Sequence, residues 1–316
     1  MAPAAAAALA GGGVTSQAPQ LDPLSALPPA ARDLLCAQFG STAARASIEP
    51  VPQTTNFVAR VLVGDEAYAL RAPRVSDAVT LVDRESELAI LETAAAAGIA
   101  PRVIAGNPHT GALLTRWIAG KPWTLERTTH DDALRLVGDL CRTLHALPVP
   151  ARARRIDLRA LIDEYALQLE RGLATLPRRG FLREAAEVAL ALRPAMLATL
   201  QDLPTLGRAL CHNDLHHRNI VDDGRLWLLD WEYAGECERL FDLASYAAQN
   251  DLDERRTARF LELCSVSGAA AARFGEWRRV FHHVALGWLV ASLLAAPSHL
   301  GTAPASLSWL MERLDG

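Results

Sequence analysis

The sequence is almost without lysine. Among its 316 residues and 32 basic side chains, Lys121 is the only lysine, and every other basic side chain is an arginine. A phosphate-binding loop of the form GxxxxGK[ST] is excluded, because Pro122 follows Lys121 and Thr115 stands where the first glycine is needed. No Ser-x-x-Lys nucleophile pair exists either, and a lysine Schiff base would have to use Lys121.

Other absences narrow the class of protein further. The net charge of −4 lacks the basic excess of a nucleic-acid binder. The longest apolar run, residues 284–297, is shorter than the roughly 20 residues of a membrane-spanning helix, so we expect a buried core helix there and no membrane partner. The five dispersed cysteines contain no CxxC pair, and residues 1–13 lack the basic start of a signal peptide. These features predict reduced thiols and a cytoplasmic protein.

The remaining composition is that of a globular enzyme, and its patterns change along the chain. Residues 1–29 are rich in Ala, Gly and Pro, which predicts a disordered tail. Residues 30–117 predict a short helix, a long helix over 77–97 and about five strands, at 47–51, 57–63, 67–72, 101–105 and 112–117. Residues 118–316 predict helices at 129–147, 156–176, 181–200 and through 240–314, interrupted by a polar, strand-rich insert at 208–231.

The polar insert contains the residues best suited to chemistry. Asp223-Gly224 is a strong hairpin signal, so the two flanking strands should bring Asn219 beside Asp230, with Asp214 in the loop that leads in. A carboxylate can accept the proton of a hydroxyl nucleophile, and carboxylate and amide oxygens are ligands for Mg²⁺. The spacing therefore favours phosphoryl transfer, with Asp214 as the base and Asn219 and Asp230 as metal ligands.

A zinc site is the alternative for the same insert. His212 and His216 are four residues apart, as on zinc-binding helices, and His217 follows. The turn-forming pair Asn213-Asp214 and the predicted hairpin oppose a helix here, and no zincin glutamate follows His212. We therefore expect His216 and His217 to be loop residues near the mouth of a substrate site.

The arrangement H-x-D-x-x-x-x-N, followed by a hairpin and Asp230, resembles the aminoglycoside phosphotransferase and choline kinase family, relatives of the protein kinases. The segments 230–235 (DWEYAG) and 241–244 (FDLA) are similar to its choline, ethanolamine and thiamine kinase branch. The resemblance extends from about Val51 onward. It implies an α+β, protein-kinase-like fold of two lobes: a small antiparallel sheet with one helix that binds nucleotide, residues 30–117, and a mainly helical catalytic and substrate-binding lobe, residues 118–316.

The resemblance also implies roles for single residues of the insert and its surroundings. Asp214 would be the catalytic aspartate, His212 would shape its loop, and Asp242 would brace that loop. Asn219 and Asp230 would bind Mg²⁺. The acceptor pocket would be bordered by the residues that follow Asp230, namely Trp231, Glu232 and Tyr233, although a structural role for Glu232 is equally open.

In the small lobe, the resemblance points to Arg71 at the end of the third strand, where kinases carry a lysine. Arginine is always charged and can hold phosphate oxygens with two donors at once. Its expected partner is Glu87 in a D-R-x-x-E pattern, while Glu85 reads as a solvated side chain. The stretch 50–57 lacks the glycines that relatives often carry before a Thr-Asn pair. Phosphate donors in this stretch would be Thr54, Thr55 and Asn56.

Together these observations predict an ATP- and Mg²⁺-dependent kinase that phosphorylates a hydroxyl of a small molecule, with an amino alcohol or thiamine-like compound as the expected acceptor. An aminoglycoside or sugar kinase of the same family is an alternative. A catalytically weak, nucleotide-binding regulatory module is a second alternative, which the glycine-poor loop allows. No nucleic-acid partner is expected, and the sequence leaves the oligomeric state open.

Overall fold

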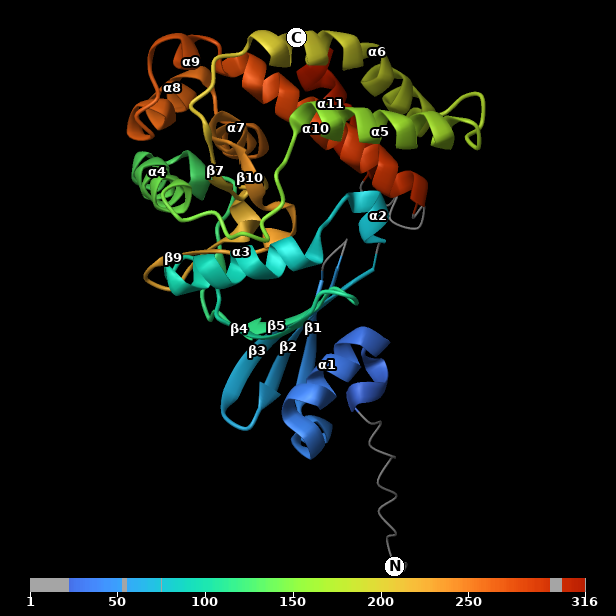
Figure 1. Cartoon of the computed structure of the whole chain (residues 1–316), viewed down its shortest axis with the longest axis vertical. Coiled ribbons are helices and arrows are strands. Elements are labelled where there is room, and N and C mark those ends of the chain that lie inside the picture. The colour runs from blue at the N-terminus through green and yellow to red at the C-terminus, as the bar shows by residue number, and fades with distance from the viewer. Residues whose placement is uncertain (1–22, 53–55, 75, 296–302, 316) are drawn as a thin grey trace, which may run out of the picture.

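The computed structural model describes residues 23–52, 56–74, 76–295 and 303–315. Residues 1–22 of the expected tail and the two phosphate-donor candidates Thr54 and Thr55 lie outside this part of the chain. The described residues form a small lobe built on a β-sheet and a larger lobe built mainly of helices, as Figure 1 shows. The predicted α+β, two-lobe architecture is confirmed.

The small lobe is an antiparallel sheet with the strand order β1-β2-β3-β5-β4. Its strands are β1 (Ser47–Val51), β2 (Asn56–Val63), β3 (Glu66–Pro73), β4 (Val103–Asn107) and β5 (Ala112–Arg116). One face is covered by α1 (Pro29–Phe39) and by the 3₁₀ turns η1 (Pro23–Ala26) and η2 (Gly40–Arg45). The expected tail of residues 1–29 extended too far, because Leu24 and Leu27 are buried in the same core as α1.

The helix expected over residues 77–97 is divided in two, α2 (Asp77–Thr80) and α3 (Arg84–Ala96). Leu81 has a left-handed backbone with φ of 57°, which ends α2, and the Asp83 side chain accepts a hydrogen bond from Ser86 N at 3.0 Å and begins α3. Aspartate is a favourable N-cap, so a second helix start competes with a continuous helix. As a result, Glu87 lies in the first turn of α3.

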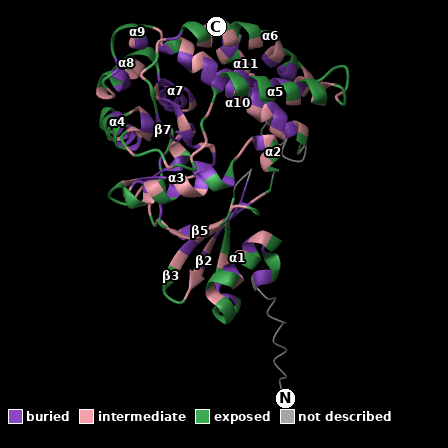
Figure 2. Cartoon of the chain, viewed as in Figure 1, coloured by how far each residue is buried: buried purple, intermediate pink, exposed green. Residues whose placement is uncertain are grey.

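The large lobe contains the remaining helices around one apolar core. Their bounds are α4 (Asp131–His145), α5 (Leu158–Leu173), α6 (Phe181–Asp202), α7 (Arg239–Gln249), α8 (Glu254–Leu263), α9 (Gly268–Ala272), α10 (Phe274–Ala295) and α11 (Ala303–Asp315). Residues 284–295 of the apolar run that the sequence assigned to a core helix lie in α10, which packs against α5, α6, α7 and α11, and the last two residues of the run lie outside the described residues. Figure 2 shows the buried face of α7 and α10 in the interior of this lobe. In the described residues, no helix is both long and apolar enough to cross a membrane.

The polar insert folds into two small strand pairs between α6 and α7. The hairpin of β8 (Ile220–Asp222) and β9 (Leu226–Leu228) is antiparallel and also pairs with β6 (Lys121–Pro122), while β7 (Arg208–Cys211) pairs with β10 (Gly235–Glu238). Two 3₁₀ turns, η4 (His217–Asn219) and η5 (Trp231–Tyr233), flank the hairpin, and η3 (Arg127–Thr129) precedes α4. The backbone of Gly120 lies against the hairpin. A Cβ atom at position 120 would be 2.4 Å from the Asp222 carbonyl oxygen, so a side chain there would clash. Glycine therefore lets the chain between the lobes pass close to the hairpin.

Candidate active site

The loop between β7 and η4 presents Asp214 at the surface of the large lobe. Asn213, immediately before it, has a left-handed backbone with φ of 64°, a conformation that asparagine tolerates better than most residues. The Asn213 N–H donates to Asp242 Oδ1 at 2.7 Å, and its side-chain amide donates to the Tyr233 carbonyl at 3.1 Å. The Asp214 side chain keeps 21% exposure, so it can contact a bound molecule.

The hairpin brings Asn219 and Asp230 to the same end of the insert, as its turn signal predicts. The Leu229 N–H donates to the Asn219 carbonyl at 2.8 Å. The Asn219 side-chain amide then donates to Asp214 Oδ2 at 2.9 Å and to the Asp214 carbonyl at 3.0 Å. Asp230, the next residue after Leu229, has a left-handed backbone with φ of 63°. The structure therefore gathers Asp214, Asn219 and Asp230 around one point.

Helix α7 holds the loop through polar residues that the sequence reading had not singled out. Ser245 Oγ accepts from the Leu215 N–H at 3.0 Å. Asn250, at the C-terminal end of α7, accepts from the His217 N–H at 2.9 Å and donates to the Leu215 carbonyl at 2.9 Å. Gln249 Nε2 donates to Asp214 Oδ1 at 3.0 Å. Asp242, Ser245 and Gln249 follow the i, i+3, i+7 spacing of one helix face, and that polar stripe in an otherwise apolar helix was the available signal.

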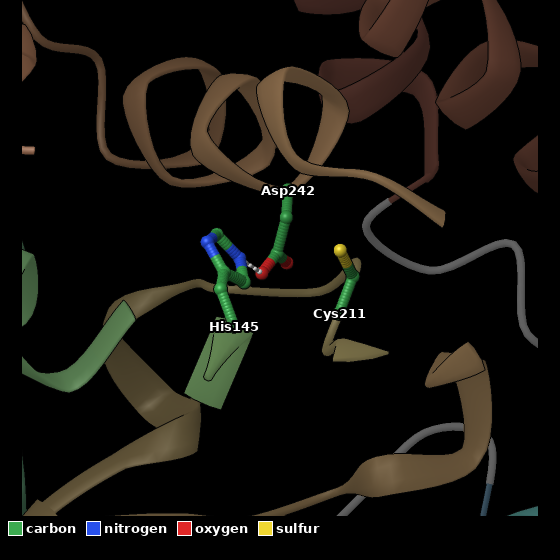
Figure 3. Close-up of side chains that lie close together, drawn as sticks. All are labelled: His145, Cys211 and Asp242. Atoms are coloured by element: carbon green, nitrogen blue, oxygen red, sulfur yellow. Dashed lines mark hydrogen bonds and ion pairs between the residues drawn. The ribbon is translucent and has the colours of Figure 1, made fainter. Parts of the chain in front are cut away.

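Asp242 is fully buried and lies between His145 and Cys211, as Figure 3 shows. His145 Nε2 donates to Asp242 Oδ2 at 2.8 Å, and the possible ligand atoms of these three residues lie within 4.8 Å of one another. Burial, followed by the negative charge of Asp242, raises the pKa of the Cys211 thiol, which therefore stays protonated. Both Asp242 oxygens already accept hydrogen bonds. The cluster is therefore a hydrogen-bonded support for the loop, in which Asp242 contacts it directly and His145 supports Asp242.

His212 is fully buried. Its Nε2 donates to the Leu229 carbonyl at 2.9 Å, and its ring packs edge-on against Trp231 at 4.8 Å. Burial lowers the pKa of His212, which favours the neutral ring. Among the described residues, His212, His216 and His217 do not form a compact group of three possible metal ligands, so the zinc alternative finds no support.

The second polar cluster joins the two lobes through buried charges. Arg71 of β3 makes a two-pronged ion pair with Glu87 of α3, with distances of 2.6 and 2.8 Å. Arg84 donates to Glu87 at 2.9 Å, to Glu232 at 3.1 Å and to Asp77 at 2.6 Å. The expected Arg71–Glu87 pair is present and Glu85 is exposed, while Arg84 was not identified from the sequence.

The charges of this cluster stabilise one another. Burial opposes ionisation of Glu87, but its ion pairs with Arg71 and Arg84 outweigh that effect and lower its pKa. Burial likewise opposes the charge of Arg71, and the carboxylates of Glu87 and Glu232 outweigh it and raise its pKa. Glu87 is therefore ionised at neutral pH, and its ion pairs with Arg71 and Arg84 hold all three side chains in a fixed direction.

Glu232 and Asn56, which were expected to contact a ligand, both bond within the charge network around Arg71. Glu232 is 3% exposed and accepts from Asn56 Nδ2 at 3.0 Å as well as from Arg84. The Asn56 amide, expected to donate to a phosphate, is thus bonded to Glu232. Of the two roles that the sequence left open for Glu232, the structure favours the structural one, because its carboxylate links β2 and α3 to the segment after Asp230.

The two aromatic residues beside Glu232 differ in their surroundings. Trp231 is 1% exposed and its indole N–H donates to the Leu228 carbonyl at 2.9 Å, so it belongs to the core and we no longer include it among the acceptor contacts. Tyr233 is half-buried, and its hydroxyl accepts from the Trp288 indole N–H at 2.7 Å. The Tyr233 and Trp288 rings meet edge to face, with centroids 6.2 Å apart.

The residues around Asp230 fit a divalent cation. Asp230 Oδ1 is buried without a hydrogen-bond partner, and the Arg71 guanidinium lies 3.5 Å from it. The side chain as a whole keeps 32% exposure, so it remains accessible. Burial and then the carboxylate of Glu232 raise the pKa of Asp230, a cost that a bound cation would offset. An asparagine that donates through Nδ2, as Asn219 does, can still offer Oδ1 to a metal.

Comparison with known proteins identifies the class to which this fold and site belong. Residues 47–280 match the model of a family described as the phosphotransferase enzyme family. Because the match covers most of the chain, the protein belongs to that family. A comparison with curated protein sequences found no match.

Solved structures share the fold at low sequence identity. An ethanolamine kinase of Plasmodium vivax is 14% identical with a TM-score of 0.66, covering 88% of this chain and 83% of that one. A choline/ethanolamine kinase family protein of Mesorhizobium loti is 23% identical with a TM-score of 0.59, covering 93% and 97%. The choline kinase LicA of Streptococcus pneumoniae, in complex with AMP, is 17% identical with a TM-score of 0.62, covering 84% and 92%.

Proposed function

We propose that the protein transfers the γ-phosphoryl group of ATP, with Mg²⁺, to a hydroxyl of a small molecule, and that this acceptor is an amino alcohol or a thiamine-like compound. The observation that carries the proposal is the meeting of Asp214, Asn219 and Asp230 within a chain of the phosphotransferase family. Two carboxylates and one amide at the end of a hairpin suit this reaction and few others.

Asp214 is the proposed base. It accepts the proton of the acceptor hydroxyl, whose oxygen forms a bond to the γ-phosphorus of ATP while the bond between that phosphorus and the leaving oxygen breaks. The products are a phosphate ester and ADP. Asn219 and Asp230 would hold Mg²⁺ through their side-chain oxygens. When bound, the ion would neutralise charge on the phosphate groups.

The small lobe, residues 30–117, is proposed to hold the nucleotide. The LicA structure that shares this fold contains AMP, which supports a nucleotide site in the same lobe arrangement. The Arg71 guanidinium lies 3.5 Å from Asp230. In our proposal Arg71 binds the phosphates of ATP, and its ion pair with Glu87 fixes its direction. Thr54 and Thr55 remain proposed phosphate donors.

The acceptor class rests on the comparisons and on one aromatic surface. The structures described above include an ethanolamine kinase, a choline/ethanolamine kinase family protein and a choline kinase. Tyr233 lies next to Glu232 in the segment after Asp230, and Trp288 packs against it. Aromatic rings attract cationic groups, which supports an acceptor with an ammonium group.

An acceptor screen tests the proposal. The purified full chain is incubated with Mg²⁺ and ATP, and acceptor-dependent ADP release is measured with amino alcohols, thiamine, sugars and aminoglycosides. The proposal expects transfer to an amino alcohol or thiamine-like compound, and none without Mg²⁺. Transfer only to a sugar or aminoglycoside would refute the acceptor class. A thermal shift with ATP but no turnover on any acceptor would instead favour the regulatory module.

A further inference from the structure

The carboxylate of Asp214 is held at both of its oxygens by neutral amides. Asn219 Nδ2 donates to Oδ2 at 2.9 Å, and Gln249 Nε2 donates to Oδ1 at 3.0 Å. Two donors on opposite oxygens fix the plane of a carboxylate as well as its position. The donors come from different sides of the site, since Asn219 precedes the hairpin and Gln249 ends α7.

We infer that Gln249 is a positioning residue for Asp214, an inference that rests on the proposed function. It fixes the direction of the carboxylate so that one free lone pair faces the acceptor hydroxyl. Asn219 holds only the other carboxylate oxygen, Oδ2, and in our proposal its own Oδ1 also holds Mg²⁺. Gln249 binds no metal in our proposal, and its backbone is held in a helix with a buried interior face.

The residue type suits the task. An amide donates a hydrogen bond without adding a positive charge that would make Asp214 a weaker base, or a negative charge that would repel it. The other titratable groups around Asp214 are His212 and His216 in its own loop, and Asp230 and Tyr233 beyond the hairpin. Gln249 therefore orients the base while leaving the charge balance of the site unchanged.

Gln249 differs from the neighbouring residues that hold the loop. Asp242, Ser245 and Asn250 bond to backbone atoms of the loop. Among the described residues, Gln249 is the one from α7 whose side chain donates a hydrogen bond to the Asp214 side chain. Loss of its amide should therefore release the carboxylate while the backbone of residues 212–219 keeps its path.

The kinetic test uses Gln249→Met, which keeps the length of the side chain and removes the donor. We expect kcat to fall about tenfold or more, the effect of losing one hydrogen bond to a charged group, while KM for ATP and the melting temperature stay unchanged. In an Asp214→Asn background the same substitution should reduce the residual turnover no further. Gln201→Met, an exposed glutamine on α6, is the matched control and should leave kcat unchanged.

Three kinetic results would overturn the inference: an unchanged kcat for Gln249→Met, an equal loss in the Asp214→Asn background, or a matching change in KM for ATP and melting temperature. A crystal structure of the Gln249→Met variant tests the same point without any turnover. We expect the Asp214 carboxylate to lose its single orientation while the loop backbone is retained. An unchanged Asp214 orientation would refute the role of Gln249. If the wild-type chain phosphorylates no acceptor, the proposed function fails separately, and the crystal structure still decides about Gln249.

Discussion

The two polar clusters of this molecule are built by different means. The loop around Asp214 is held mainly from one helix, α7, by the neutral side chains of Ser245, Gln249 and the adjoining Asn250 and by the carboxylate of Asp242. The network around Arg71 is held by buried ion pairs among β3, α3 and the segment after Asp230, and by a hydrogen bond from Asn56 of β2. The hydrogen bonds from α7 to the loop join residues 29 to 35 positions apart, whereas the network joins residues up to 176 positions apart.

This contrast assigns different tasks to the two clusters. Neutral donors can fix a base without changing its charge, so the loop suits proton transfer. Buried ion pairs contribute little net stability, but removal of one partner is costly because it leaves an unpaired charge. The network therefore fixes the direction of Arg71, which in our proposal binds the phosphates of ATP. Substitutions in the loop should act on kcat, and substitutions in the network should act on the ATP requirement and on stability.

The largest expected effect is at the loop. Asp214→Asn removes the proposed base, and kcat should fall by about 10²–10⁴-fold, the usual contribution of a general base. Binding of ATP should be nearly unchanged, because Asp214 belongs to the loop and not to the network. Steady-state kinetics together with calorimetric titration of ATP check both parts. Turnover close to that of the wild type would remove Asp214 as the base.

The next effect is at the network. Arg71→Ala should raise KM for ATP about tenfold or more, since a hydrogen bond to a charged group is worth about 1.5–3 kcal/mol. The same change leaves Glu87 with Arg84 alone and should lower the melting temperature. Arg71→Lys keeps the charge but loses the two-pronged geometry, so its effect should be intermediate. An unchanged KM for ATP in both variants would refute the proposed role of Arg71 in phosphate binding.

A smaller effect is expected in the pH dependence of stability, which should differ between the network and the loop. Burial raises the pKa of Glu87, and the ion pairs with Arg71 and Arg84 outweigh it, so the folded pKa lies below the ordinary value of 4.5. The network thus contributes stability above about pH 4.5 and loses it as the pH falls through the lower, folded pKa. Urea unfolding of Glu87→Gln should depend less on pH in this range than that of the wild type. Ser245→Ala, at the neutral loop, should keep the wild-type pH dependence.

The smallest effect is expected at the single lysine. Lys121 is exposed in β6, where it pairs with Asp222 in the strand register, and it is not part of either cluster. Lys121→Arg should change neither kcat nor KM for ATP beyond about twofold. A large rise in KM for this variant would mean that the connection between the lobes takes part in nucleotide binding.

The two clusters also differ in how far the sequence could predict them. The loop was predictable because its residues are consecutive and a hairpin signal fixes the meeting of Asn219 and Asp230. The contacts of Glu232 with Arg84 and Asn56 depend on the docking of the two lobes, which no local pattern records. Helix periodicity also missed the break at Leu81, because the N-cap Asp83 competes with a continuous helix. Gln249 was not predicted, because the polar residues Asp242, Ser245 and Gln249 of α7 were not recognised as a surface that contacts the loop.

The central claim is that the protein makes a phosphate ester through Asp214. Phosphorus NMR of a reaction with ATP, Mg²⁺ and an amino alcohol tests it most directly. The account predicts a new phosphomonoester signal that grows with ADP in the wild type and in Lys121→Arg, and that is nearly absent in Asp214→Asn. A wild-type chain that binds ATP but gives no ester signal with any hydroxyl acceptor would contradict the account.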